Sequence, residues 1–131
     1  EELLARIDPL AAVRPVMSRS DVIELQRMVS EVRVDDALLD YLLKIVEATR
    51  NNDSLELGIS PRGALALFRC AQASAFIEGR DYCIADDIKR LVVPCFGHRV
   101  IVNSRATSMR QRTRESEQVL LDLLSKVSVP I

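Results

Sequence analysis

Along most of the chain, apolar residues recur at intervals of three and four positions, which is the spacing of an amphipathic helix. In the first such stretch, Ser18 and Asp21 form a capping signal ahead of an apolar stripe made of Val22, Leu25, Val29 and Val32. A second helix is expected to begin at Asp35-Asp36, where carboxylates suit the positive end of a helix, and to stop at Asn51-Asn52. Residues 53–59 lack this spacing and are expected to form a loop.

The clearest helix start is Ser60-Pro61, because serine is a good N-cap and proline at the first helical position loses no hydrogen bond. This helix is expected to continue through an alanine-rich stretch to Gly79, which can close it in the left-handed conformation. Cys70 is expected on the buried face of this helix, as a small apolar residue.

The remaining segments are shorter. Residues 80–84 are expected to be an extended connector, and Asp86-Asp87 opens a brief helix that Pro94 interrupts or restarts. The apolar run 100–102 could be extended. A last helix is expected to be capped by Thr113 and to stop before Pro130. The pattern as a whole predicts an all-α bundle of four or five helices.

Composition narrows the possible functions. The 131 residues suit one domain, and a net charge of −1 gives no general attraction to nucleic acid or to an anionic membrane. No apolar run is long enough for insertion into a membrane. Three widely spaced cysteines indicate reduced thiols in a cytoplasmic protein, and the lone His98 has no partner at ligand spacing, so no metal site is expected.

The start of the chain indicates an excised piece. Glu1 stands where an initiating methionine is expected, and four glycines leave little material for a phosphate-binding loop. Residues 1–15, with Pro9 and Pro15, are expected to form a short helix and then a linker. The chain is therefore expected to derive from a longer protein.

Arg62 is the strongest candidate for chemistry. It lies in the first turn after Ser60-Pro61, where backbone N–H groups lack partners and the helix dipole is positive. A cation is mildly disfavoured there unless an anion faces it, and free N–H donors with a guanidinium group make a good phosphate receptor. The alternative is that Arg62 is simply solvated.

Several motifs in order resemble the C-terminal lid domain of MoxR-family AAA+ ATPases, and they span nearly the whole chain. They are Asp8-Pro9-Leu10, Val13-Arg14-Pro15-Val16, Val34-Asp35-Asp36, Leu39-Asp40-Tyr41, Gly58-Ile59-Ser60-Pro61-Arg62-Gly63, Gly79-Arg80-Asp81-Tyr82, Asp86-Asp87-Ile88-Lys89, His98-Arg99 and residues 127–130. Two positions depart from that pattern: Gly63 stands where a better helix former is expected, and Ile84 stands where a Ser or Thr cap is usual.

The resemblance implies that Arg62 is the sensor 2 arginine, which reaches the γ-phosphate of ATP, with Ser60 and Pro61 setting the helix start that aims it. It implies residues 1–16 as the end of an ATPase core and a linker, and residues 17–131 as the lid. ATP and Mg²⁺ belong to the parent protein, with Mg²⁺ held by the core; the fragment alone is expected to bind no cofactor. Because no P-loop or Walker B motif is present, the fragment alone should be inactive. Family analogy adds a homo-oligomeric ring, a hexamer, and von Willebrand factor A domain partners in a chaperone-like machine.

The segment from His98 to Arg114 offers an alternative function. It contains Arg99, Arg105, Arg110, Arg112 and Arg114 and no acidic residue, so a non-enzymatic module could bind nucleic acid or a protein through it. No aromatic residue lies there to stack on bases, so nucleic acid is the less favoured partner. The competing interpretation is a solvated loop between two helices.

Overall fold

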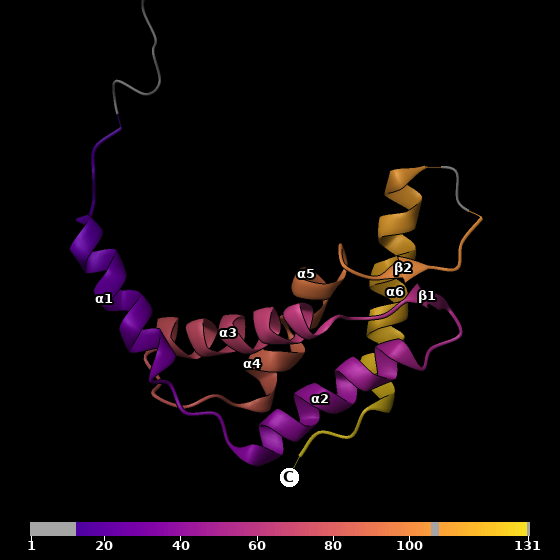
Figure 1. Cartoon of the computed structure of the whole chain (residues 1–131), viewed down its shortest axis with the longest axis horizontal. Coiled ribbons are helices and arrows are strands. Elements are labelled where there is room, and N and C mark those ends of the chain that lie inside the picture. Colours follow the sequence, from indigo (N-terminus) through magenta and orange to yellow (C-terminus); the bar gives the residue numbers. More distant parts are fainter. Residues whose placement is uncertain (1–12, 106–107, 131) are drawn as a thin grey trace, which may run out of the picture.

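The computed structural model describes residues 13–105 and 108–130. These residues form six helices and a small two-stranded sheet (Figure 1). In chain order the elements are α1 (Arg19–Ser30), α2 (Asp36–Arg50), β1 (Leu55–Leu57), α3 (Pro61–Ile77), α4 (Ala85–Lys89), α5 (Val92–Phe96), β2 (Ile101–Val102) and α6 (Met109–Lys126). The predicted helical class is confirmed. The brief helix expected from Asp86-Asp87 is divided into α4 and α5, but the break precedes Pro94, which lies inside α5. The expected helix within residues 1–15 falls mainly outside the described residues.

The core lies between α2, α3 and α6, with α4 and α5 packed against α3. α3 crosses the middle of the molecule, and α6 passes near the ends of α2 and the sheet (Figure 1). The fully buried side chains of the core are mainly aliphatic, as a chain with few aromatic residues requires. The largest of them are Tyr41, Phe96, Leu42, Ile45, Ile59, Leu67, Ile88, Leu120 and Val92.

The expected loop at 53–59 contains a strand, so that prediction was wrong in part. β1 pairs antiparallel with β2, with Leu55 opposite Val102. Leu55 is buried, and the amide of Asn103 donates to the Ser54 carbonyl at 2.9 Å, which closes the end of the pair. A strand as short as β1 depends on a partner far along the chain. The extended segment expected at 100–102 is confirmed by β2.

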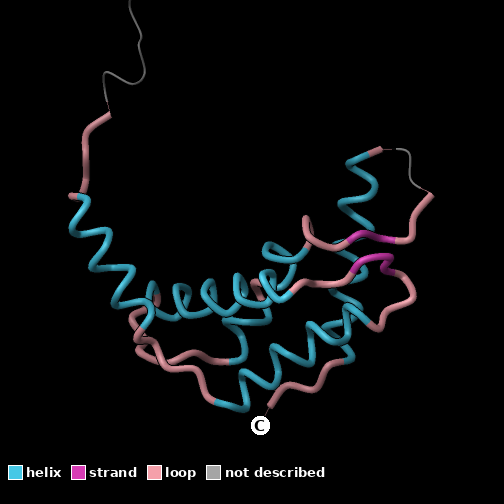
Figure 2. The backbone as a smooth tube through the Cα atoms, viewed as in Figure 1, coloured by secondary structure: helices cyan, strands magenta, loops and turns pink. Residues whose placement is uncertain are grey.

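α1 is capped as predicted but does not join the core. Ser18 and Asp21 form a reciprocal capping box at its start, yet none of its residues is buried. Val22 and Leu25 of the predicted stripe are 41% and 37% exposed, and only Val32, beyond the helix end, is buried. The helix projects from one end of α3, away from the rest of the fold (Figure 2). Its apolar face is therefore not a core face among the described residues.

The two longest helices show one correct and one incorrect cap prediction. α3 begins at Pro61 with Ser60 as its cap, and Gly79 follows it with φ 76°, as expected. α6 begins at Met109 with Ser108 as its cap, several residues before the predicted Thr113. The Thr113 hydroxyl instead donates to the Met109 carbonyl at 3.0 Å, one turn back within the helix.

Cys70 corrects a further expectation about α3. It is exposed rather than buried, because the buried face of this helix runs through other positions. Those positions are Gly63, Leu67, Ala71, Gln72 and Ala75.

Candidate functional site

The loop that leads into α3 is held against the C-terminal end of α2. The Ile59 amide donates to Thr49 Oγ1 at 2.9 Å, and Arg50 Nε donates to the Ile59 carbonyl at 2.8 Å. A Cβ on Gly58 would lie 2.7 Å from the Thr49 carbonyl oxygen, so only glycine allows this close approach. Ile59, the residue just before the N-cap of α3, is thereby held through both its amide and its carbonyl oxygen.

The first turn of α3 carries a cation, and of its backbone amides only that of Arg62 has no partner among the described residues, since the Ala64 amide donates to the Ser60 carbonyl at 3.0 Å. Ser60 Oγ accepts from the Gly63 amide at 3.2 Å, Pro61 occupies the first helical position, and the turn has no acidic residue. Arg62 is exposed, and its guanidinium group has no hydrogen bond or ion pair with the other described residues. The positive end of a 17-residue helix and an unpaired arginine thus occupy the same surface.

Arg62 shares an open hollow of about 700 Å³ with two further arginines, Arg50 from the end of α2 and Arg99 from between α5 and β2. We call this hollow the arginine pocket. Its lining residues come from the end of α2, from the connection between β1 and α3 with the first turn of α3, and from the connection between α5 and β2. Its lining consists of Arg50, Leu57, Gly58, Ile59, Ser60, Pro61, Arg62 and Arg99. The structure therefore brings the predicted Ser60, Pro61 and Arg62 together, and adds two cations that sequence reasoning did not place there.

The pocket is suited to binding an anion rather than to acid–base or nucleophilic chemistry. None of its lining residues is a carboxylate, histidine or cysteine. The nearby Cys95 thiol has its pKa raised to about 11, chiefly by burial and further by a hydrogen bond with Cys70, so it stays protonated at neutral pH. Guanidinium groups and helix N–H donors are the groups that bind phosphate oxygens. The pocket can therefore hold phosphate charge, and its lining contains no carboxylate to hold Mg²⁺.

No metal site is evident elsewhere in the part of the chain that the structure describes, since its His, Cys, Asp and Glu side chains form no group of three or more. Among the same residues, no helix has both the length and the apolar character needed to cross a membrane.

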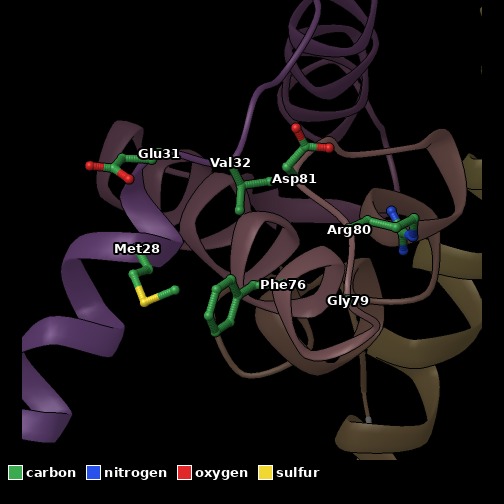
Figure 3. A pocket seen from close by; sticks show the side chains of 7 residues that line it. All are labelled: Met28, Glu31, Val32, Phe76, Gly79, Arg80 and Asp81. Atoms are coloured by element: carbon green, nitrogen blue, oxygen red, sulfur yellow. The ribbon is translucent and has the colours of Figure 1, made fainter.

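A second hollow, of about 420 Å³, lies between α1 and the end of α3 (Figure 3). Met28 and Phe76 supply apolar surface there, and the Arg80 side chain turns away from them toward the buried Asp87. Its only basic residue is thus engaged elsewhere, so this hollow lacks the free cations of the arginine pocket.

The basic segment 98–114 does not form a single loop. Arg99 belongs to the arginine pocket, whereas Arg110, Arg112 and Arg114 lie on α6. The competing interpretation of a solvated loop was therefore wrong for the part from Met109 onward, because α6 begins there.

Comparison with known proteins shows the family of the chain. The family model of the AAA lid domain matches residues 47–121. The chain is 38% identical over 123 residues to the uncharacterized protein YeaC of Bacillus subtilis, covering 94% of this chain and 38% of YeaC. It is 30% identical over 98 residues to the chaperone MoxR1 of Mycobacterium tuberculosis, covering 68% of this chain and 26% of MoxR1.

A crystal structure of a candidate ATPase from Cytophaga hutchinsonii superposes with a TM-score of 0.79 at 27% sequence identity, covering 98% of this chain and 41% of that one. The chain thus spans less than half the length of each of these relatives.

Proposed function

Because this chain belongs to the AAA lid domain family and is related to MoxR chaperones, we propose that it is the C-terminal lid of a MoxR-like AAA+ ATPase and that Arg62 is its sensor 2 arginine. In this proposal residues 17–131 are the lid, and residues 1–16 are the end of the ATPase core and the linker. The observation that carries the proposal is the position of Arg62, which lies in the first turn of α3 on the wall of the arginine pocket and pairs with no other residue in the described part of the chain.

In the parent enzyme, ATP lies between the core and this lid. The core supplies the P-loop and the carboxylate that holds Mg²⁺, because this chain contains neither motif and its pocket lacks a carboxylate. Arg62 donates to γ-phosphate oxygens, where negative charge is concentrated, and so stabilises the transition state of phosphoryl transfer.

The same contact couples the lid to the nucleotide. While the γ-phosphate is present, Arg62 holds the lid toward the core. When hydrolysis removes the γ-phosphate, this contact is lost and the lid is released. The helices around Arg62 share one aliphatic core, so this part of the lid, without α1, moves as a unit. We further propose a cytoplasmic homo-oligomeric ring, a hexamer, that acts as a chaperone-like assembly machine with von Willebrand factor A domain partners. This part of the proposal extends from the similarity to MoxR1, which is named a chaperone.

The test is Arg62→Ala in the ATPase that carries this chain. We expect ATP turnover to fall by roughly 10²-fold, the order seen when one donor to developing charge is removed. Arg69→Ala is the matched control, because Arg69 is exposed on the same helix but does not line the pocket. Unchanged turnover and unchanged nucleotide affinity in Arg62→Ala would refute the sensor role. A protein sequence without a P-loop upstream of residue 1 would refute the lid assignment.

A further inference from the structure

Arg50 and Arg99 have a bonding pattern that distinguishes them from ordinary surface arginines. Each uses only its Nε atom within the described chain: Arg50 Nε donates to the Ile59 carbonyl at 2.8 Å, and Arg99 Nε to the Cys95 carbonyl at 3.0 Å. The terminal nitrogens of both groups bind no other described residue. The backbone thus restrains both guanidinium groups and leaves the N–H groups of their terminal nitrogens without a partner among the described residues.

We propose that Arg50 and Arg99 bind the same phosphate chain as Arg62, so that the lid contributes three arginines, rather than one, to the nucleotide. This inference rests on the proposed function and extends it. A fork of terminal nitrogens, already oriented through Nε, can donate two hydrogen bonds to a phosphate group at a small entropic cost. The ligand class is therefore a polyphosphate with several adjacent anionic groups, as in a nucleoside triphosphate.

The charge distribution supports this assignment. Four other arginines pair with carboxylates: Arg27 with Glu24, Arg33 with Asp81, and both Arg80 and Arg90 with Asp87. The arginine pocket gathers three cations with no carboxylate in its lining. Three like charges around one hollow repel each other, and an anion between them removes that repulsion.

Gly63 shows how closely Arg99 approaches the first turn of α3. A Cβ at this position would lie 3.5 Å from Arg99 Cδ, an ordinary van der Waals contact, so the stem of Arg99 packs beside the turn that carries Arg62. The same Cβ would lie 2.8 Å from Cγ2 of the buried Ile59, and this close contact is the reason for glycine here.

The experiment measures binding of sodium tripolyphosphate to the 131-residue chain by titration calorimetry at low salt. Replacement of Arg50, Arg62 or Arg99 by Gln is expected to weaken binding roughly tenfold each, the loss typical of one charge-assisted hydrogen bond. Arg69→Gln, on α3 but outside the pocket, is expected to bind within about twofold of the unmodified chain. If Arg50→Gln and Arg99→Gln bind as the unmodified chain does, the inference is wrong.

Lysine variants separate direct contact from a structural role. Arg50→Lys and Arg99→Lys keep the charge but cannot reproduce the Nε geometry. Direct contact predicts that the lysine variants bind more tightly than the glutamine variants, with helical content unchanged by circular dichroism. Equal losses for Lys and Gln would assign both residues a purely structural role and overturn the inference.

Two further ligands identify the source of the phosphate. ATP is expected to bind within a few-fold of tripolyphosphate, and adenosine is expected not to bind. Binding of tripolyphosphate without binding of ATP would assign the pocket to a free polyphosphate and overturn the nucleotide assignment.

The outcomes also separate this inference from the proposed function. Loss of ATP turnover in Arg62→Ala together with normal tripolyphosphate binding by Arg50→Gln and Arg99→Gln keeps the sensor role and removes the three-arginine inference. Loss of tripolyphosphate binding in all three Gln variants together with normal turnover in Arg62→Ala keeps the pocket and removes the sensor role.

Discussion

Arg80 and Asp87 form a two-pronged ion pair at the C-terminal end of α3: Arg80 Nη1 lies 2.7 Å from Asp87 Oδ2, and Arg80 Nη2 lies 2.8 Å from Asp87 Oδ1. Asp87 is fully buried, and its Oδ2 also accepts from the Ile84 amide at 2.9 Å, which caps α4. Ile84 itself offers no side-chain acceptor, so Asp87 supplies the cap that the sequence lacks at that position. One carboxylate thus joins α3, the connector after it and α4.

Asp87→Asn is expected to destabilise the chain by about 3 kcal/mol, because it leaves the Arg80 charge only partly neutralised in a poorly solvated place. The measurement is urea-induced unfolding followed by circular dichroism. Asp81→Asn is the matched control: Asp81 pairs with Arg33, but the two side chains are 81% and 73% exposed, so a change below about 0.5 kcal/mol is expected. Equal effects of the two substitutions would contradict a special role for the buried pair.

The same pair predicts a loss of stability in acid. Burial alone would raise the pKa of Asp87, but its hydrogen bonds with Arg80 and Ile84 and the charges of Arg80 and Arg90 together hold the pKa below its usual 3.8. A carboxyl group with a lowered pKa in the folded state stabilises the fold fully above its unfolded pKa, and this contribution is lost as the pH falls through the folded pKa. The free energy of unfolding should therefore decline below pH 3.8. Unfolding curves across this range should show a smaller decline in Asp87→Asn; an identical decline would assign the acid sensitivity to other groups.

Ser60→Ala and Ser108→Ala should separate stability from binding. Both serines cap long helices, with Oγ accepting from the Gly63 amide at 3.2 Å and from the Gln111 amide at 3.3 Å. Loss of such a cap costs about 1 kcal/mol, so urea unfolding should show similar destabilisation for both variants. Only Ser60 lines the arginine pocket, so only Ser60→Ala should weaken tripolyphosphate binding. Equal binding in the two variants would argue against a role of the α3 cap in the pocket.

Gly63→Ala should destabilise the chain, although alanine is the better helix former. Helix propensity alone predicts a gain of about 1 kcal/mol. The new methyl group would, however, lie 2.8 Å from Cγ2 of the buried Ile59, and overpacking of this kind costs about 1–3 kcal/mol. The net change, measured by urea unfolding, should be a loss of stability together with weaker tripolyphosphate binding. A more stable variant with unchanged binding would show that Ile59 and Arg99 can move without consequence.

The parts of the fold that follow local rules were predictable from the sequence. The boundaries of α2 and the start of α3 depend on carboxylates, a serine and a proline at the helix ends, and each acts within one turn. Arg62 could be identified as a candidate site residue for the same reason, because its electrostatic setting is determined by its own helix. The left-handed Gly79 likewise needs only the end of a helix and a residue without a side chain.

The parts that failed depend on contacts between distant segments. β1 exists because β2 pairs with it, and no residue in 53–59 signals that partner. The arginine pocket joins Arg50, Arg62 and Arg99 from three separate segments, so no spacing rule could have united them. Arg99 was noticed in the His98-Arg99 motif and in the basic segment 98–114, but neither pattern places it beside Arg62, and no pattern pointed to Arg50. For α6, two possible caps stand close together, and Ser108 is the one whose hydroxyl reaches a free amide.

The absence of buried residues in α1 has a consequence for cooperativity. A 12-residue helix is marginal by itself in water, and this one is supported by its capping box and by the pairing of Arg27 with Glu24 and Glu31. Its amide protons should therefore exchange with solvent through local opening, at a free energy far below that of global unfolding. Amides in the middle of α3, by contrast, should exchange only when the whole domain opens. The described residues thus form one cooperative unit and a separate helix, α1, whose stability depends on what packs against its apolar face.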